Sequence, residues 1–307
     1  MRRPLALVLG GGGARGALQV GAIRALLEAG IRPSLLVGTS IGAVNATYLA
    51  VRGLNPQGLE GLVGAWHDAA AADLLPANYL WLTLRVLFNR AGWRPYHRMR
   101  DFFVGQGLSP DLRFGDVQGV RLILVAADLN AGRPVLYGID PQQPVLEGLL
   151  ASTALPPWVH PLQKGEQFLM DGGVVSNLPV EAALDQGVRA VIALDLADPR
   201  VIPVGGHGFG PFLGKLVRTV EQRQADLELA LAAARGVPVR HIVLHSDEPV
   251  PIWDFQHTDE LIARGYTITR REMARWPPER QAWWRAVLAR LIEGRGAGVS
   301  HRPAIES

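Results

Sequence analysis

The first fifty residues carry the pattern that most restricts how this chain can fold. An apolar run at 5–9 leads into a glycine loop at 10–16 and a helical pattern over 17–29. A second apolar run ends at Val37, and another helical pattern begins near Ile41. Short continuous apolar runs are typical of strands buried on both faces. Two such strands joined by a helix pair in parallel, so this βαβα start predicts an α/β fold around a parallel sheet.

The remainder of the chain extends this pattern without a repeat or a composition shift that would mark a second domain. Apolar runs predict further strands at 120–127, 134–139, 167–170, 190–194 and 239–245, the second of them antiparallel to the first. Helical patterns cover 59–70, 144–152, 179–186, 212–235, 258–273 and 279–293. We therefore expect a single domain over residues 1–293, followed by a disordered tail over 294–307.

The turn between the second strand and its helix has the sequence Gly38-x-Ser40-x-Gly42. This is the strand–turn–helix setting in which a serine on a sharp turn acts as a nucleophile. Side chains at Gly38 or Gly42 would crowd the turn and block access to the hydroxyl. The free N–H groups and the dipole at the helix start also favour negative charge there. The alternative is a tight turn in which Ser40 only caps the helix.

The glycine loop allows two interpretations. Gly11-x-Gly13-x-x-Gly16 matches the dinucleotide-binding fingerprint, but no carboxylate ends the second strand, where that function requires one. In the other interpretation, the N–H groups of Gly12 and Gly13 stabilise the oxyanion of an acyl-transfer intermediate. The glycine and serine loops follow neighbouring parallel strands, so both can lie at the same end of the sheet. Arg15 then braces the glycine loop.

A serine hydroxyl needs a base, and the strand ends offer three carboxylates: Asp128, Asp171 and Asp195. Sites in parallel sheets gather beyond the carboxyl ends of the strands, which all three residues follow. Asp171 differs because Gly172 and Gly173 come next and allow close approach to its carboxylate; the alternative role is an Asx turn. A Ser–His–acid triad would instead draw on one of the late histidines, His241, His245 or His257.

Composition excludes several other classes of protein. Apolar residues make up 48% of the chain, which fits a globular protein, and the net charge of +3 does not indicate nucleic-acid binding. There is no cysteine and no cluster of metal-ligand residues, so neither disulfides nor a metal is expected. No apolar stretch is long enough to span a membrane, and we expect a cytoplasmic protein. The aromatic, arginine-flanked segment Tyr79–Tyr96 can cap an acyl pocket or contact an anionic membrane surface; otherwise it is a buried helix.

Five stretches, in order, resemble the patatin-like phospholipases. Three match the signatures of that family: Gly11–Gly16, Gly38–Gly42 and Asp171–Gly173. Ala151–Pro156 and Ser176–Pro179 resemble the segments on either side of its aspartate. The resemblance extends over about residues 5–195, and three ordered motifs are more specific than any one of them.

The resemblance implies a three-layer α/β/α sandwich and a lipid acyl hydrolase with a Ser–Asp dyad. Ser40 would attack the ester carbonyl, Asp171 would act as general base, and the loop at Gly11, Gly12 and Gly13 would hold the oxyanion. An acyl-enzyme on Ser40 would then be released by water, with no cofactor or metal. The substrates would be phospholipids, lysophospholipids or related lipid esters.

One departure from the family pattern and two competing functions remain to be considered. Trp158 and His160 occupy a segment that is usually apolar in the family, so His160 is a candidate for the pocket wall. The competing functions are a Rossmann-like nucleotide-binding protein and a catalytically silent binding protein with the patatin fold. Acyl-chain length, head group and oligomeric state are not predicted.

Overall fold

A computed structural model describes residues 4–72, 95–156, 159–198 and 209–276. The chain divides into two compact units, Met1–Thr269 and Arg270–Ser307, and the candidate site lies in the first. The segment predicted to contact lipid falls outside the described residues, except that Pro95 begins a helix. The predicted helix at 279–293, the tail at 294–307 and Trp158 also lie outside them. A single domain over residues 1–293 stays a prediction.

The strands occupy the positions that the apolar runs predict, with one additional short strand. They are β1 (Leu5–Leu9), β2 (Leu35–Thr39), β3 (Arg121–Asp128), β4 (Arg133–Tyr137), β5 (Leu162–Lys164), β6 (Gln167–Asp171), β7 (Ala190–Leu196) and β8 (Val239–Leu244). The sequence analysis did not predict β5, because Leu162, Gln163 and Lys164 form no apolar run.

The described helices are α1 (Ala17–Glu28), α2 (Ile41–Arg52), α3 (Pro56–Ala71), α5 (Pro95–Gly105), α6 (Val145–Ser152), α7 (Val180–Leu184), α8 (Phe209–Ala234) and α9 (Thr258–Ala274). Short 3₁₀ turns include η1 (Gly13–Gly16) in the glycine loop and η3 (Gly172–Val174) after β6. Asn55 caps α3 by accepting a hydrogen bond from the Gly58 N–H, which is the usual role of Asn before a helix-initiating proline.

The strands form one sheet in the order β5-β6-β3-β2-β1-β7-β8, with β4 paired to β3. The five strands from β3 to β8 in this order are parallel, whereas β4, β5 and β6 are antiparallel to their neighbours. The predicted antiparallel β3–β4 pair is confirmed. The assumption that Asp171 ends a parallel strand is wrong, because β6 runs antiparallel to β3.

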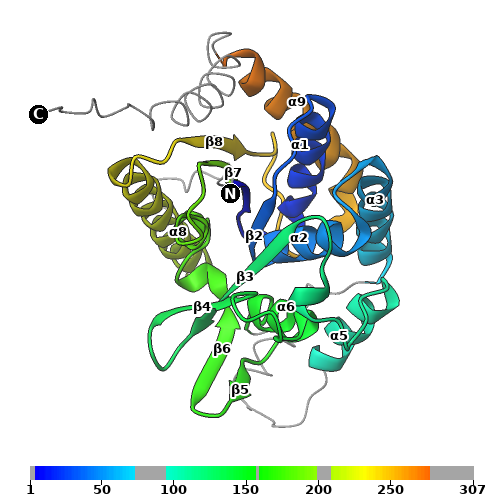
Figure 1. The fold of residues 1–307 in the computed structure, drawn as a ribbon, viewed down its shortest axis with the longest axis vertical. Helices are drawn as coiled ribbons and strands as arrows, with labels where there is room; N and C mark the ends of the chain where they lie inside the picture. The colour runs from blue at the N-terminus through cyan, green and yellow to red at the C-terminus, as the bar shows by residue number, and fades with distance from the viewer. Residues whose placement is uncertain (1–3, 73–94, 157–158, 199–208, 277–307) are drawn as a thin grey trace, which may run out of the picture. The chain divides into compact units, whose positions relative to one another are not determined.

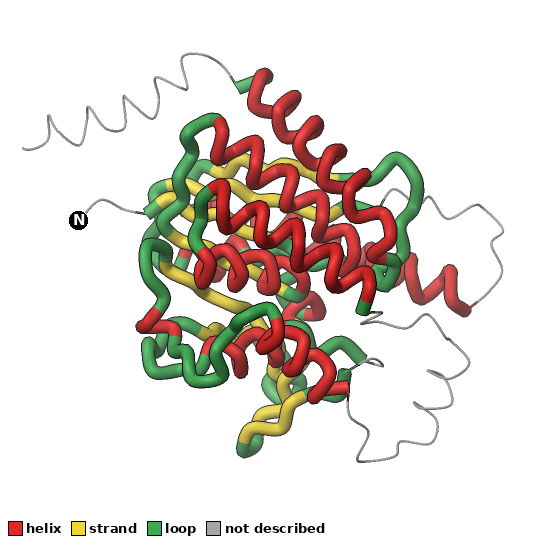
Figure 2. The backbone as a smooth tube through the Cα atoms, turned by 90° about the vertical axis from the view of Figure 1, so that its right-hand side faces the viewer, coloured by secondary structure: helices red, strands yellow, loops and turns green. Residues whose placement is uncertain are grey.

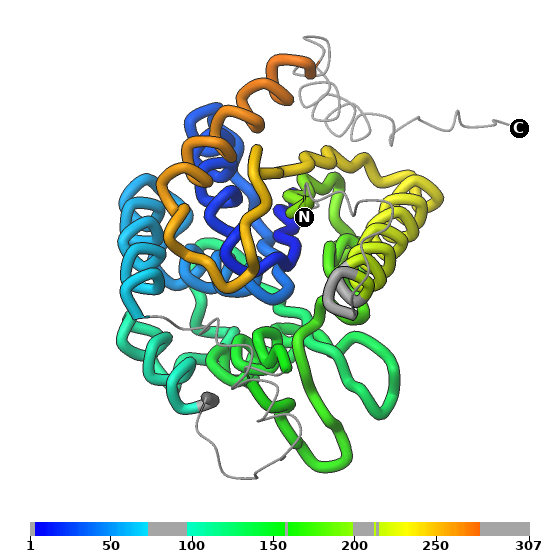
Figure 3. The backbone as a smooth tube through the Cα atoms, turned by 180° about the vertical axis from the view of Figure 1, so that it is seen from behind, coloured from blue at the N-terminus to red at the C-terminus, as the bar shows by residue number. Residues whose placement is uncertain are grey.

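Helices cover both faces of the sheet and make a three-layer α/β/α sandwich. In Figure 1, α1, α2 and α3 lie on one side of the strands and α8 on the other. Figure 2 shows the helices of one layer in front of the strands, and Figure 3 shows α8 from behind. One core cluster joins β1, β2, β3 and β7 to α7 and α8 through Val8, Val37, Val180 and Ala225. None of the helices in the described ranges has the length and apolar character required to cross a bilayer.

Candidate active site

Ser40 lies on a strained turn between β2 and α2. It is the non-glycine residue in the described ranges with a positive φ, at 55°, a conformation that costs energy and that is found preferentially at functional sites. The turn also needs both of its glycines. A Cβ on Gly38 would lie 2.5 Å from the Gly42 carbonyl oxygen, and one on Gly42 would lie 2.1 Å from the Leu9 carbonyl oxygen. The sequence Gly38-x-Ser40-x-Gly42 therefore forms the sharp turn that it predicts.

Ser40 and Asp171 meet on one edge of β3. Thr39 of β2 pairs with Val125 of β3, and Asp171 of β6 pairs with the next residue, Ala126, on the same edge, while β4 occupies the opposite edge. Because β6 takes the pairing position directly after the end of β2, the Asp171 side chain lies beside Ser40. The Ser40 hydroxyl donates a hydrogen bond of 2.6 Å to Oδ2 of Asp171. The antiparallel β6 thus positions the carboxylate by ending beside the serine turn.

The Asp171 carboxyl is buried and has one further hydrogen-bond donor. Its side chain is 3% exposed, and Oδ1 accepts a hydrogen bond of 2.8 Å from the Gly173 N–H. Burial raises the pKa of Asp171 from 3.8 to about 6, while the hydrogen bonds from Ser40 and Gly173 partly offset this increase. The group is therefore a stronger base than an ordinary carboxylate and is still mostly ionised at neutral pH.

Ser152 supports the serine turn from the end of α6. Its hydroxyl donates to the Val125 carbonyl oxygen at 2.6 Å and accepts the Ser40 N–H at 3.1 Å. The side chain is fully buried. Sequence reasoning included Ser152 in a family-like stretch but gave it no role, because the bridge joins residues far apart in the chain.

The glycine loop lies directly against the serine turn. A Cβ on Gly11 would lie 3.1 Å from the Ser40 Cβ and 2.4 Å from Oδ1 of Asn177. The Gly11 N–H donates to the Asn177 carbonyl oxygen at 3.0 Å. Within the described residues, the N–H groups of Gly12 and Gly13 donate no hydrogen bond. Gly11 therefore fixes the loop, and Gly12 and Gly13 carry the N–H groups from which a ligand could accept hydrogen bonds.

Arg15 anchors the glycine loop from the buried side. Its Nε donates to the Gly12 carbonyl oxygen at 3.2 Å, and its guanidinium forms an ion pair with Asp198 at 3.3 Å. A trans peptide holds its C=O and N–H in opposite directions, so the bond to Gly12 also fixes the direction of the Gly13 N–H. Gly16 packs against Ile41, with no space for a Cβ. Both residues thus have structural roles in the loop.

A buried polar network also holds the glycine loop to the helices. Gln19 donates to the Gly10 carbonyl oxygen at 2.8 Å. Asn45 donates to the Gly16 carbonyl oxygen and to the Gln19 side chain, both at 3.0 Å, and accepts the Trp66 indole N–H at 3.0 Å. Sequence patterns did not identify this network, because its members lie one to each of α1, α2 and α3 with no shared motif.

The loop after Asp171 is fixed by α8. Gln224 accepts the Asn177 N–H at 3.2 Å and donates to the Val174 carbonyl oxygen at 2.8 Å. The Ser176 hydroxyl bonds to Glu228, which also accepts the Glu181 N–H at 2.6 Å. Gly172 is packed so closely that a Cβ would lie 2.3 Å from the Val125 carbonyl oxygen. These contacts make α8 a support for the carboxylate loop.

The other predicted bases have partners elsewhere. Asp128 accepts the Asn130 N–H in the β3–β4 turn, and Asp195 lies 2.9 Å from His241. No histidine in the described ranges hydrogen-bonds Ser40: His245 contacts the Ser246 carbonyl, His257 lies beside Asp254 and Glu260, and His160 is exposed. The neighbouring Val159, and not His160, lines the pocket described below. Asp171 is therefore the base candidate that contacts Ser40.

The described residues contain no group of three His, Asp or Glu side chains arranged to hold a metal ion. The dinucleotide interpretation of the glycine loop would require a carboxylate at the end of β2, and that strand ends at Thr39. The Thr39 hydroxyl instead donates to the Ser176 carbonyl oxygen at 2.9 Å.

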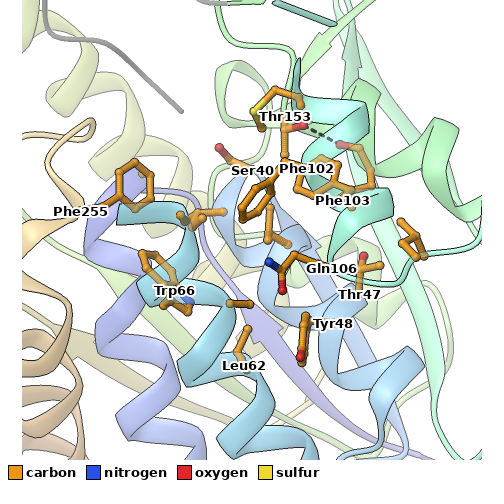
Figure 4. A pocket seen from close by; sticks show the side chains of 18 of the residues that line it. Ser40, Thr47, Tyr48, Leu62, Trp66, Phe102, Phe103, Gln106, Thr153 and Phe255 are labelled. Atoms are coloured by element: carbon orange, nitrogen blue, oxygen red, sulfur yellow. Dashed lines mark hydrogen bonds between the residues drawn. The ribbon is translucent and has the colours of Figure 1, made fainter. Parts of the chain in front are cut away.

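An apolar cavity opens beside Ser40 and Asp171. It encloses about 1120 Å³ of empty space, with the open solvent at its mouth included. Figure 4 shows Ser40, Phe102 and Thr153 in the upper part of the view, Trp66 and Thr47 at one level below them, and Tyr48 and Leu62 lower still. The walls come mainly from α2, α3 and α5, and Gly13 and Phe255 also line the cavity. A serine that is hydrogen-bonded to a carboxylate base, two available N–H groups and an apolar cavity together suit acyl transfer with an apolar substrate.

Comparison with known proteins gives the same indication from the sequence. A family model described as "Patatin-like phospholipase" matches residues 7–184, more than half of the chain. The human patatin-like phospholipase domain-containing protein 6 is 32% identical over 211 residues, 66% of this chain and 14% of that protein. An uncharacterised protein of Bacillus subtilis is 29% identical over 208 residues, 62% of this chain and 70% of the relative. This chain thus spans a small part of the human protein.

Among solved structures, VipD from Legionella pneumophila is similar over 88% of this chain and 66% of its own. The TM-score is 0.47, and 15% of the aligned residues are identical.

Proposed function

This chain belongs to the patatin-like phospholipase family, and we propose that it is a lipid acyl hydrolase that cleaves carboxylic esters through Ser40 and Asp171. The observation that carries the proposal is the 2.6 Å hydrogen bond from the Ser40 hydroxyl to the buried Asp171 carboxylate. The strained conformation of Ser40 and the apolar cavity beside it support the same conclusion.

In the first half of the reaction, Ser40 Oγ attacks the ester carbonyl carbon while its proton moves to Oδ2 of Asp171. The tetrahedral intermediate collapses, the C–O bond to the alcohol breaks, and Asp171 returns the proton to the leaving oxygen. Water then attacks the acyl-enzyme and gives a proton to Asp171. The bond between the acyl carbon and Ser40 Oγ breaks, Asp171 passes the proton to Oγ, and the carboxylic acid product leaves. A base with a pKa of about 6 suits both proton transfers near neutral pH.

The negative oxygen of each intermediate would accept hydrogen bonds from the N–H groups of Gly12 and Gly13. The family resemblance assigns this role to Gly11 as well, but the Gly11 N–H already bonds to Asn177. Fixed donors are worth about 10²–10³ in rate for each hydrogen bond to a developing oxyanion. Arg15 would keep the Gly13 N–H directed by holding the Gly12 carbonyl.

Hydrolysis of a short-chain nitrophenyl ester tests the proposal. We expect Ser40→Ala and Asp171→Asn to lose activity while circular dichroism shows that both variants fold. Asp128→Asn is the matched control, because it changes another buried strand-end carboxylate that does not contact Ser40. Unchanged activity in Asp171→Asn would refute the dyad, and an inactive intact protein would favour a binding protein without turnover.

The substrate at family level is a lipid ester, whereas the head group is not assigned. A cytoplasmic location and contact with a membrane surface stay predictions from the sequence. Binding of the intact protein to anionic phospholipid vesicles by co-sedimentation would test the membrane contact.

A further inference from the structure

We propose that the cavity beside Ser40 binds a single saturated acyl chain of about 12–14 carbons, and that Arg52 sets this limit. The inference rests on the proposed function, because it treats the cavity as the acyl site of the same ester hydrolase. It concerns the length of chain that binds, which the catalytic residues do not determine.

The cavity follows one face of α2 from its first residue to its last. Ser40 precedes the helix, Val44, Thr47 and Val51 follow at a spacing of three to four residues, and Arg52 ends it; all five line the cavity. Val44, Thr47 and Val51 share one face of the helix at this spacing, and Arg52 adjoins that face at its last turn. The reacting oxygen therefore lies at one end of the cavity and a guanidinium at the other.

Contacts from α3 and α5 show how these two helices lie along α2 and the cavity. Near Ser40, Trp66 of α3 hydrogen-bonds Asn45 of α2. Farther along, Tyr48 lies against Gly61 of α3. At the far end, Nη2 of Arg52 donates at 2.8 Å to the carbonyl oxygen of Gln106, just after α5. α3 thus runs antiparallel to α2 beside it, and the end of α5 meets the end of α2.

Arg52 and the turn after α5 form the end of the cavity. Gly107 adopts a φ of 86°, and a Cβ there would lie 1.9 Å from Nη2 of Arg52. The guanidinium therefore lies against this turn, and because Arg52 is exposed to solvent, its charge is hydrated at the outer end of a mostly apolar wall. A longer chain would have to displace water from the guanidinium with its terminal methylene groups, which desolvates a charge without a compensating contact.

The length of α2 converts this arrangement into a chain length. Ser40 and Arg52 are twelve residues apart, which is about 18 Å along a helix that rises about 1.5 Å per residue. Carbon–carbon bonds of about 1.5 Å meeting at about 111° advance an extended chain by about 1.25 Å per carbon. About 14 carbons fit, and the tilt of helical side chains toward the helix start reduces this to about 12–14.

Binding to the Ser40→Ala protein tests the limit without requiring catalysis. The ligands are saturated fatty alcohols of 8–18 carbons, measured by displacement of anilinonaphthalene sulfonate below their aggregation concentrations. Each methylene that enters an apolar site should tighten binding about fourfold. We expect that gain up to 12–14 carbons and none beyond.

The chain length beyond which affinity stops rising is called the break here. Two substitutions in the Ser40→Ala background should move the break in opposite directions. Arg52→Ala removes about five bonds of side chain, so the break should move about four carbons higher. Val44→Phe fills the cavity one turn from Ser40, so affinity should no longer rise with chain length anywhere in the series from eight carbons upward. Arg98→Ala is the matched control: this exposed arginine also bonds a carbonyl at a helix end, that of Ala72, but does not line the cavity.

Affinity that rises steadily to 18 carbons, or a break that Arg52→Ala leaves unmoved, would overturn the inference. These results are separate from the proposed function. An intact protein that hydrolyses no ester but keeps the break would refute the hydrolase and support the chain site. An active hydrolase whose Ser40→Ala variant binds all lengths equally would do the reverse.

Discussion

Replacing Asp171 with Asn should stabilise the folded protein at pH 8 while it removes the proposed base. Asn can keep both hydrogen bonds, because its oxygen can accept the Gly173 N–H and its amide can donate to Ser40 Oγ. What it loses is the buried negative charge. The gain in the free energy of unfolding should therefore come only from the removal of that charge.

The pKa of Asp171 gives the size of the effect. Burial raises it from 3.8 to about 6, so the folded state binds a proton more tightly than the unfolded state does. The contribution to stability is complete below pH 3.8 and is lost as the pH rises through 6. At about 1.4 kcal/mol per pKa unit, the loss reaches about 3 kcal/mol at pH 8, with about half of it present at pH 5.

Urea unfolding of both proteins between pH 4 and pH 8 measures this difference. The midpoint for Asp171→Asn should rise relative to the intact protein as the pH increases, while other ionisable groups cancel in the comparison. Asp128→Asn should show the opposite sign: although burial acts to raise the pKa of Asp128, hydrogen bonds from Asn130, Phe168 and Ala131 lower it. A pH-independent difference between Asp171→Asn and the intact protein would refute the assigned environment.

Three further predictions concern the same site. Plotted against pH, kcat/KM should rise about tenfold per unit below pH 6 and level off above it, because Asp171 must be ionised to accept a proton; a profile centred near pH 4 would contradict this. Ser152→Ala should lower stability by about 1–3 kcal/mol in urea unfolding and reduce kcat, because it leaves the Ser40 N–H and the Val125 carbonyl unpaired. Gly42→Ala should lower the free energy of unfolding by more than about 4 kcal/mol, since its Cβ would lie 2.1 Å from a carbonyl oxygen. Gly64→Ala, in open space on α3, should raise it by about 1 kcal/mol. Equal shifts in the melting temperatures of the two variants would contradict the packing.

The sequence alone predicts the parallel core and the serine turn because both depend on local patterns. Continuous apolar runs indicate β1 and β2, and the Gly-x-Ser-x-Gly pattern marks the turn. Gly38 is required by contacts with Gly42 and Ala43 within the turn, whereas Gly42 is required by its contact with Leu9 at the end of β1. Asp171 could be proposed from the glycines after it, but its contact with Ser40 depends on the pairing of β6 with β3. No local pattern specifies that pairing, and the assumption of a parallel strand was wrong.

The supports of the site were beyond sequence reasoning for a similar reason. Ser152, Gln224 and Glu228 each bond to a loop that lies far away in the chain. Polar residues within helices usually indicate only a solvated face, so nothing in the pattern separates these from the rest. The walls of the cavity were also unpredicted, because part of them comes from α5, whose residues 95–105 show no clear helical pattern in the sequence.

The most direct test of the central claim is intact-protein and peptide mass spectrometry after reaction with a fluorophosphonate that labels activated serines. The account predicts a single adduct on Ser40, none on the folded Ser40→Ala protein, and much slower labelling of Asp171→Asn. Labelling of another residue at the same rate in Ser40→Ala, while that variant still hydrolyses the nitrophenyl ester, would contradict it.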